Sequence, residues 1–162
     1  MRCVSASTEQ PAATEQPAAT EQAAPVPITV VGRLILLARI WILAARVAVS
    51  LRRRPLADVV SALSTPTRER DLPPAFTSHA VSRGLRLGSW QPRCLIRSLV
   101  LYRMLRAQGL VPELVIGLPD HSHDTDAHAW VELAGRDMGP APGRSNHREL
   151  TRYPRPAAPP GG

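Results

Sequence analysis

The chain has 162 residues and a formal net charge of +7, and all 20 of its basic residues are arginine. That length accommodates one domain. The arginines are spread along the chain without interleaved aromatic residues, and no DNA-reading motif occurs, which argues against nucleic-acid binding. The two cysteines, Cys3 and Cys94, form no disulfide framework, and the first residues lack the layout of a secretory signal. We therefore expect a cytoplasmic protein.

Both ends of the chain have compositions that cannot support a core. Residues 1–27 contain a near-perfect Thr-Glu-Gln-Pro-Ala-Ala repeat, and residues 154–162 are rich in proline and glycine. Such segments bury too little apolar surface to offset their ordering entropy, so we expect two disordered tails. Between them we expect an N-terminal helical region over residues 28–63 and the main core over residues 64–153.

The first predicted element is a long apolar helix over residues 27–54. Arg33, Arg39 and Arg46 interrupt it, so its charge-free stretches are shorter than the roughly 18 residues of a spanning helix. An arginine at mid-membrane also costs several kcal/mol. We expect this helix to pack on the domain or on a partner, and the alternative is peripheral membrane contact through residues 28–51.

Three further helices are predicted. The first covers residues 55–63, and the second covers residues 79–87 with Thr77 or Ser78 as its cap. The strongest covers residues 93–108 and ends at Gly109, where a left-handed cap belongs. Its apolar residues form one wide stripe: Leu95, Ile96, Leu99, Val100, Met104 and Leu105. Its arginines lie off that stripe and are expected to face solvent or an acidic partner: Arg97, Arg103 and Arg106.

The period of the pattern then changes to that of strands. Residues 112–118 and 127–133 read as two strands joined by a polar loop, and Ala134-Gly135 is a turn into a return strand that starts at residues 136–138. Helices that precede an antiparallel sheet indicate the α+β class.

Cys94 is the first candidate for chemistry. A thiol in the first turn of a helix is favoured as thiolate by the helix dipole, and the free N–H groups there can stabilise an oxyanion. His128 is the second candidate, because its neighbours Ala127 and Ala129 leave room for another group. A helix packed on a sheet can bring the two within reach, as a Cys–His pair requires. The alternatives are a buried structural thiol and a structural histidine.

Residues 121–128 offer a rival site, because they hold three histidines and two aspartates. These side chains suit zinc or nickel, but their spacing matches no known structural zinc motif. We favour a solvated loop and expect neither a metal nor another cofactor.

Four segments together resemble a known family. They are Trp90-Gln91-Pro92-Arg93-Cys94-Leu95-Ile96-Arg97-Ser98-Leu99, Leu105 to Leu110, Glu113-Leu114-Val115-Ile116-Gly117, and Ala127-His128-Ala129-Trp130-Val131-Glu132. This combination resembles the lasso peptide biosynthesis B2 proteins, which belong to the transglutaminase-like cysteine peptidase superfamily.

The resemblance implies a leader peptidase with papain-like chemistry and a core of the same kind. Cys94 would attack the scissile carbonyl, and His128 would transfer the proton. The implied partners are the ribosomally made precursor peptide, a small leader-binding protein and an asparagine-synthetase-like, ATP-dependent cyclase that closes the macrolactam. A transglutaminase-like acyltransferase and a non-catalytic adaptor remain alternatives.

The third catalytic group is less well defined. The family commonly places an aspartate about twelve residues after the histidine, where this chain has Pro140. Asp137 is the nearest acid, and a two-residue turn would pair it with Glu132 on the face of His128, about 13 Å away by strand rise. The alternatives are Asn146, a backbone carbonyl or a plain Cys–His dyad. Trp90 and Trp130 are candidates to line a peptide groove, and at least one is expected to be core packing over the helix.

Overall fold

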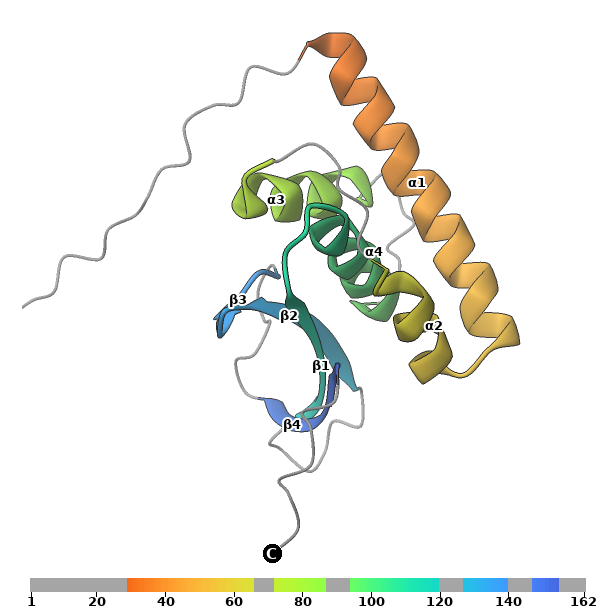
Figure 1. The fold of residues 1–162 in the computed structure, drawn as a ribbon, viewed down its shortest axis with the longest axis vertical. Helices are drawn as coiled ribbons and strands as arrows, with labels where there is room; N and C mark the ends of the chain where they lie inside the picture. The colour runs from red at the N-terminus through yellow and green to blue at the C-terminus, as the bar shows by residue number, and fades with distance from the viewer. Residues whose placement is uncertain (1–28, 66–71, 87–93, 120–126, 140–146, 155–162) are drawn as a thin grey trace, which may run out of the picture.

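Helices precede strands in the computed structural model, which describes residues 29–65, 72–86, 94–119, 127–139 and 147–154 (Figure 1). Within these residues the elements are α1 (Val30–Arg53), α2 (Leu56–Leu63), α3 (Pro74–Gly84), α4 (Cys94–Ala107), β1 (Pro112–Pro119), β2 (His128–Leu133), β3 (Arg136–Asp137) and β4 (His147–Tyr153). The α+β class is confirmed. The two tails predicted at the chain ends lie outside the described residues, apart from Pro154.

The strands form one antiparallel sheet in the order β3-β2-β1-β4. Ala134 and Gly135 join β2 to β3 with φ values of 50° and 75°, as a two-residue hairpin turn requires. β4 was not predicted, because its residues lack the alternation of a half-buried strand. It is an edge strand, and its middle residues are exposed.

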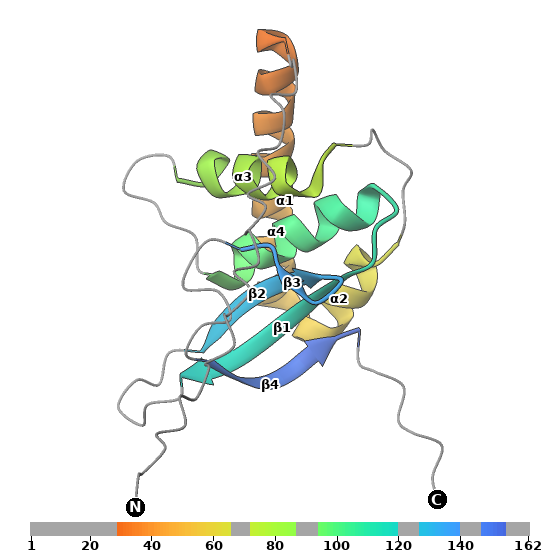
Figure 2. The same ribbon diagram turned by 90° about the vertical axis from the view of Figure 1, so that its left-hand side faces the viewer.

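α4 is the central element, with the sheet on one side and the other helices on the other (Figures 1 and 2). Leu114 of β1 and Val131 of β2 face it from the sheet, and Ile40 of α1 and Val81 of α3 meet it from the helical side. Apolar residues on nearly all sides of α4 are therefore buried: Leu99, Val100, Leu101, Tyr102 and Leu105. This arrangement fixes the first turn of α4 against the sheet.

The C-terminal end of α4 confirms the predicted cap. Gly109 has a φ of 80°, its N–H donates to Arg106 O at 3.0 Å, and the N–H of Leu110 donates to Leu105 O at 3.2 Å. These two bonds form a Schellman motif, which positions the chain to enter β1.

The predicted start of the third helix was wrong. α3 begins at Pro74, because proline suits the first helical turn, where its missing N–H has no intrahelical role. Thr77 therefore lies inside the helix, and its hydroxyl donates to Pro73 O at 3.4 Å. The hydroxyl of Ser78 donates to Met138 O, which ties α3 to the residue after β3.

Two arginines of α4 hold a neighbouring segment in place. The guanidinium of Arg106 donates to Ser64 O at 2.7 and 3.0 Å, and Arg103 donates to Thr65 O. Both side chains thus bind the carbonyls that follow α2 while remaining partly exposed, and contact of this helix face with an acidic partner stays a prediction.

Gly117 is the point of closest approach on the outer face of the sheet, the face opposite α4. A Cβ there would lie 2.7 Å from Arg148 O and 2.8 Å from the indole of Trp130. We predict that Gly117→Ala lowers the free energy of unfolding by about 1–3 kcal/mol, because the strand or the indole must move. Urea unfolding followed by tryptophan fluorescence measures this, and an unchanged midpoint would contradict the contact.

Candidate active site

β3 pairs only with Glu132 and Leu133 of β2, so the earlier part of that edge of β2 has no strand beside it. The first turns of α4 cover this edge. The carbonyls of residues 127, 129 and 131 all point toward this edge, because carbonyl direction alternates along a strand. Val131 O accepts from Met138 N at 2.8 Å, at the end of β3. Where β3 stops, Ser98 Oγ donates to Ala129 O at 2.7 Å.

Cys94 continues this series one helical turn earlier. It is the first residue of α4, it is half-buried, and its Sγ lies 3.7 Å from Ala127 O as a weak S–H donor. The thiol therefore lies beside the peptide group that leads into His128. As the first helical residue, Cys94 also presents a backbone N–H that has no partner within the helix.

His128 begins β2 and lies among other rings. Its imidazole centroid is 5.1 Å from that of His147 on β4 and 6.3 Å from the Trp130 ring, which is stacked at an interplanar angle of 17°. Burial lowers the pKa of His128 below its ordinary value, and the charges of His147 and Arg97 lower it further, whereas Asp137 opposes them. At neutral pH the imidazole is therefore neutral and available as a base.

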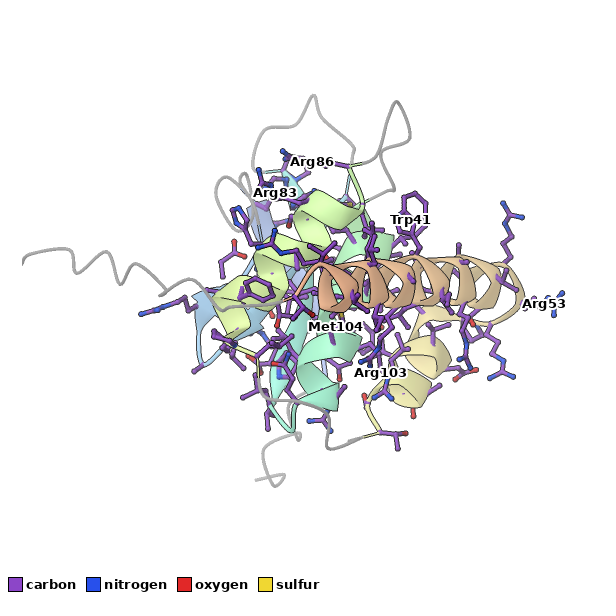
Figure 3. The ribbon with its side chains drawn as sticks, turned by 90° about the horizontal axis from the view of Figure 1, so that it is seen from above. Trp41, Arg53, Arg83, Arg86, Arg103 and Met104 are labelled. Carbon is purple, nitrogen blue, oxygen red and sulfur yellow. The ribbon has the colours of Figure 1, made fainter. Side chains whose placement is uncertain are left out.

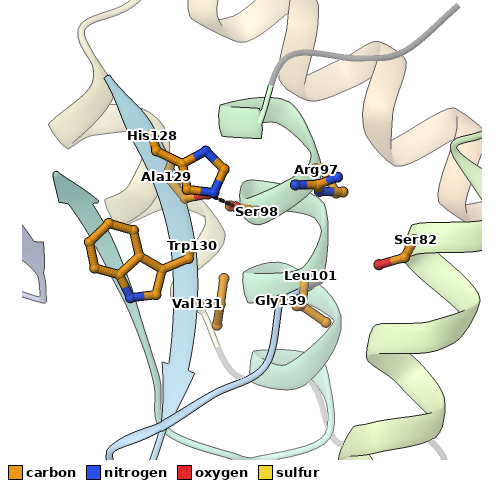
Figure 4. A pocket seen from close by; sticks show the side chains of 9 residues that line it. All are labelled: Ser82, Arg97, Ser98, Leu101, His128, Ala129, Trp130, Val131 and Gly139. Carbon is orange, nitrogen blue, oxygen red and sulfur yellow. Dashed lines mark hydrogen bonds between the residues drawn. The ribbon is translucent and has the colours of Figure 1, made fainter. Parts of the chain in front are cut away.

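Arg97 connects the two candidate residues electrostatically. It lies one helical turn after Cys94, on the same face of α4. Burial lowers the pKa of Arg97, and the charge of Cys94 raises it. Figure 4 shows Arg97 facing the start of β2 across a pocket between α4 and β2. The pocket is lined by Ser82, Arg97, Ser98, Leu101, His128, Ala129, Trp130, Val131 and Gly139.

Asp137 has the register predicted for it. It pairs with Glu132 and so shares the sheet face of His128. Its Oδ1 accepts from Gly139 N at 2.8 Å, which fixes the carboxylate at the end of β3. Its influence on the pKa of His128 ranks behind burial, His147 and Arg97. The structure thus gives Asp137 an electrostatic influence on the imidazole, and its catalytic role stays a prediction.

Trp130 is a packed residue, with 2% of its surface exposed. Its indole covers Gly117 on the face of the sheet away from α4, so Trp130 is core packing on the sheet, and whether Trp90 packs over the helix stays a prediction. The indole N–H donates to Glu132 Oε1 at 3.0 Å. Trp90, the other proposed groove residue, lies outside the described residues, as do Asn146, His121 and His123.

Within the described part of the chain, no cluster of three histidine, cysteine or acidic side chains could hold a metal ion. The histidine-rich segment lies mostly in residues 120–126, outside that part. The expectation that the protein needs no metal stays a prediction.

Sequence reasoning missed His147 and Arg97 as members of this region. The spacing of Arg97 from Cys94 was a usable signal, because residues three apart share a helix face. Nothing local marks His147, since its contact with His128 depends on β4 pairing with β1.

We predict that His147→Asn raises the pKa of His128, because it removes the second imidazole charge. NMR titration of the ring protons measures this. The matched control is Arg148→Gln, which removes a charge from the next, exposed residue of β4. An equal effect of both variants, or none from His147→Asn, would contradict a specific His128–His147 coupling.

The lowered pKa of His128 also predicts how the free energy of unfolding changes with pH. Below the ordinary histidine value of about 6.5, the unfolded chain binds a proton more readily than folded His128 does. Stability that is present above this pH is therefore lost as pH falls through the lower, folded value. Urea titrations on the two sides of this range should show a smaller loss in His147→Asn than in the unmodified protein.

Comparison with known proteins agrees with this architecture. Neither the curated proteins nor the solved structures include a match to the chain. The sequence profile of the transglutaminase-like superfamily matches residues 34–152, which covers all four helices except the first residues of α1 and nearly the whole sheet. The chain belongs to the transglutaminase-like superfamily.

Proposed function

We propose that this protein is a cysteine peptidase that removes the leader from a ribosomally made lasso precursor peptide. The observation that carries the proposal is the position of Cys94, at the first residue of α4 with its Sγ 3.7 Å from the carbonyl that precedes His128. Membership of the transglutaminase-like superfamily supports thiol-based acyl transfer. The sequence resemblance to lasso B2 proteins, carried by the segments around Cys94 and His128, supports the substrate.

In the proposed reaction, His128 takes the proton of the Cys94 thiol and the sulfur attacks the scissile carbonyl. The backbone N–H of Cys94 supports the resulting oxyanion. The imidazolium then gives its proton to the leaving amine, which frees the core peptide and leaves the leader as a thioester. Water, deprotonated by His128, hydrolyses the thioester and restores the thiol.

The lowered pKa of His128 has a consequence for the resting enzyme. Its imidazole is neutral before the reaction, so His128 acts as a general base and is not already protonated as an imidazolium. Arg97 lies one helical turn after Cys94 on the same face of α4, and the two are coupled electrostatically. Asp137 is proposed as the acid that supports the imidazolium when it forms during turnover.

The proposal places the protein in the cytoplasm with three partners. These are the precursor peptide, a small leader-binding protein that presents it, and an asparagine-synthetase-like cyclase that consumes the new N-terminus.

Transglutaminase-like acyl transfer is the second candidate, because it uses the same thioester and differs only in the acceptor. Cleavage in ¹⁸O-labelled water separates the two. A peptidase places the label in the leader carboxylate, whereas an acyltransferase joins the leader to an added amine.

The direct test is alkylation by iodoacetamide across pH 5 to 9, with sites assigned by mass spectrometry. We expect Cys94 to be labelled faster than the reference residue Cys3 near neutral pH, and more slowly in His128→Asn, because the imidazole takes the proton of the thiol. Labelling of Cys94 that follows the ordinary thiol value near 8.5, and is equal in both proteins with precursor and leader-binding protein present, would overturn the proposal.

A further inference from the structure

The outward side of α1 is an apolar surface. Ile40, Ala44 and Val47 are buried against the domain, and their spacing of four and three residues defines the inner face of the helix. The opposite face carries exposed residues spaced by three, four or seven: Val31, Ala38, Ile42, Ala45 and Val49. Val31 is 65% exposed and Ile42 is 61% exposed. An apolar helix face of this kind, directed away from the protein's own core, indicates a surface that binds a partner or a membrane.

The charges of α1 indicate what covers it. Every charged residue of α1 is an arginine: Arg33, Arg39, Arg46, Arg52 and Arg53. Arg39, Arg46 and Arg53 follow one another at intervals of seven, so they form one margin of the apolar face. In Figure 3, α1 crosses the near side of the molecule with Trp41 at its flank and Arg53 at its end. Such a basic margin complements anionic phosphate groups.

α1 is also long and apolar enough to cross a bilayer, by length and composition alone. Its best 18-residue window has a mean hydropathy of 2.1, and 17% of that window is buried. Spanning would pull Ile40, Ala44 and Val47 out of the core. It would also place Arg39 and Arg46 in the hydrocarbon. A helix held on the domain by one face can instead lie in the plane of a membrane surface, with its arginines at the headgroups.

From these observations we propose that the outward face of α1 docks the protein peripherally on an anionic lipid bilayer. The apolar residues enter the boundary between headgroups and acyl chains, and the arginine margin binds lipid phosphates. This goes beyond the proposed peptidase activity and does not depend on it, because α1 supplies none of the residues proposed for catalysis.

The test is co-sedimentation of the full chain with two kinds of vesicle, phosphatidylcholine alone and phosphatidylcholine with an equal part of phosphatidylglycerol. We expect binding to the anionic vesicles that weakens with salt. Val31→Gln with Ile42→Gln should raise the lipid concentration for half-binding about tenfold or more, because two apolar side chains of the outward face no longer enter the bilayer. The matched control is Val111→Gln with Leu150→Gln, both residues being 65% exposed but outside α1.

Sedimentation velocity without lipid provides the second readout. Loss of binding in the α1 variant but not in the control would support the proposal, with circular dichroism confirming that both are folded. No binding of the unmodified protein to anionic vesicles, or equal binding of both variants, would overturn it. A dimer that dissociates only in the α1 variant, without lipid binding, would assign the face to a second copy of the chain instead.

Discussion

Replacing Cys94 with alanine is expected to lower the rate of leader cleavage by a factor of about 10⁴ or more, because the nucleophile is lost and only binding effects remain. Purified precursor, leader-binding protein and enzyme are mixed, and the released leader is measured by mass spectrometry. The fold should tolerate the change, since Cys94 is half-buried at a helix start and its thiol makes a weak S–H bond to Ala127 O.

The matched control is Cys3→Ser, which removes the other thiol and should leave the cleavage rate unchanged. Cys94→Ser keeps a hydroxyl of similar shape and should be nearly as inactive as the alanine variant, because a serine hydroxyl is a poorer nucleophile in a site built for a thiol. Full precursor maturation by Cys94→Ala would eliminate both the peptidase and the acyltransferase. It would favour an adaptor that only docks other proteins.

Sequence periodicity predicted the elements whose burial is decided locally. These elements are the apolar stripe on α4, the cap at Gly109 and the Ala134-Gly135 turn. Each depends on residues close to one another in the chain, so a short window of sequence is enough to predict it. The start of α3 was placed too late because Pro74 was interpreted only as a break, although proline also begins helices.

The candidate site was only partly predictable for a related reason. Cys94 and His128 carry recognisable local patterns, and the register of Asp137 followed from the length of one turn. The position of His147 depends on β4, an exposed edge strand whose pairing with β1 is a long-range event. The burial of Trp130 against Gly117 likewise depends on the pairing of β2 with β1, which no short window of sequence contains.

Arg152→Ala is expected to cause the largest loss of stability. Arg152 lies on the outer face of the sheet, where its guanidinium binds Glu113 at 2.7 Å, Glu132 at 2.9 Å and Glu149 at 2.7 Å. The hydrogen bonds with Glu149, and then those with Glu132 and Glu113, raise the pKa of Arg152 above its ordinary value. One cation thus balances three carboxylates, and Glu132 is only 3% exposed.

Removing that cation leaves a buried carboxylate without its counter-charge, which costs about 3 kcal/mol of unfolding free energy. Urea unfolding measures the loss, and the matched control is Arg148→Ala, an exposed arginine of the same strand, with an effect within about 0.5 kcal/mol. Glu132→Gln in the Arg152→Ala background should recover part of the loss, since it removes the unbalanced charge.

Because Glu132 also holds the indole that stacks on His128, the Arg152→Ala variant should lose cleavage activity even at temperatures where it remains folded. Equal stability of the two arginine variants would mean that Glu132 is neutralised by another group.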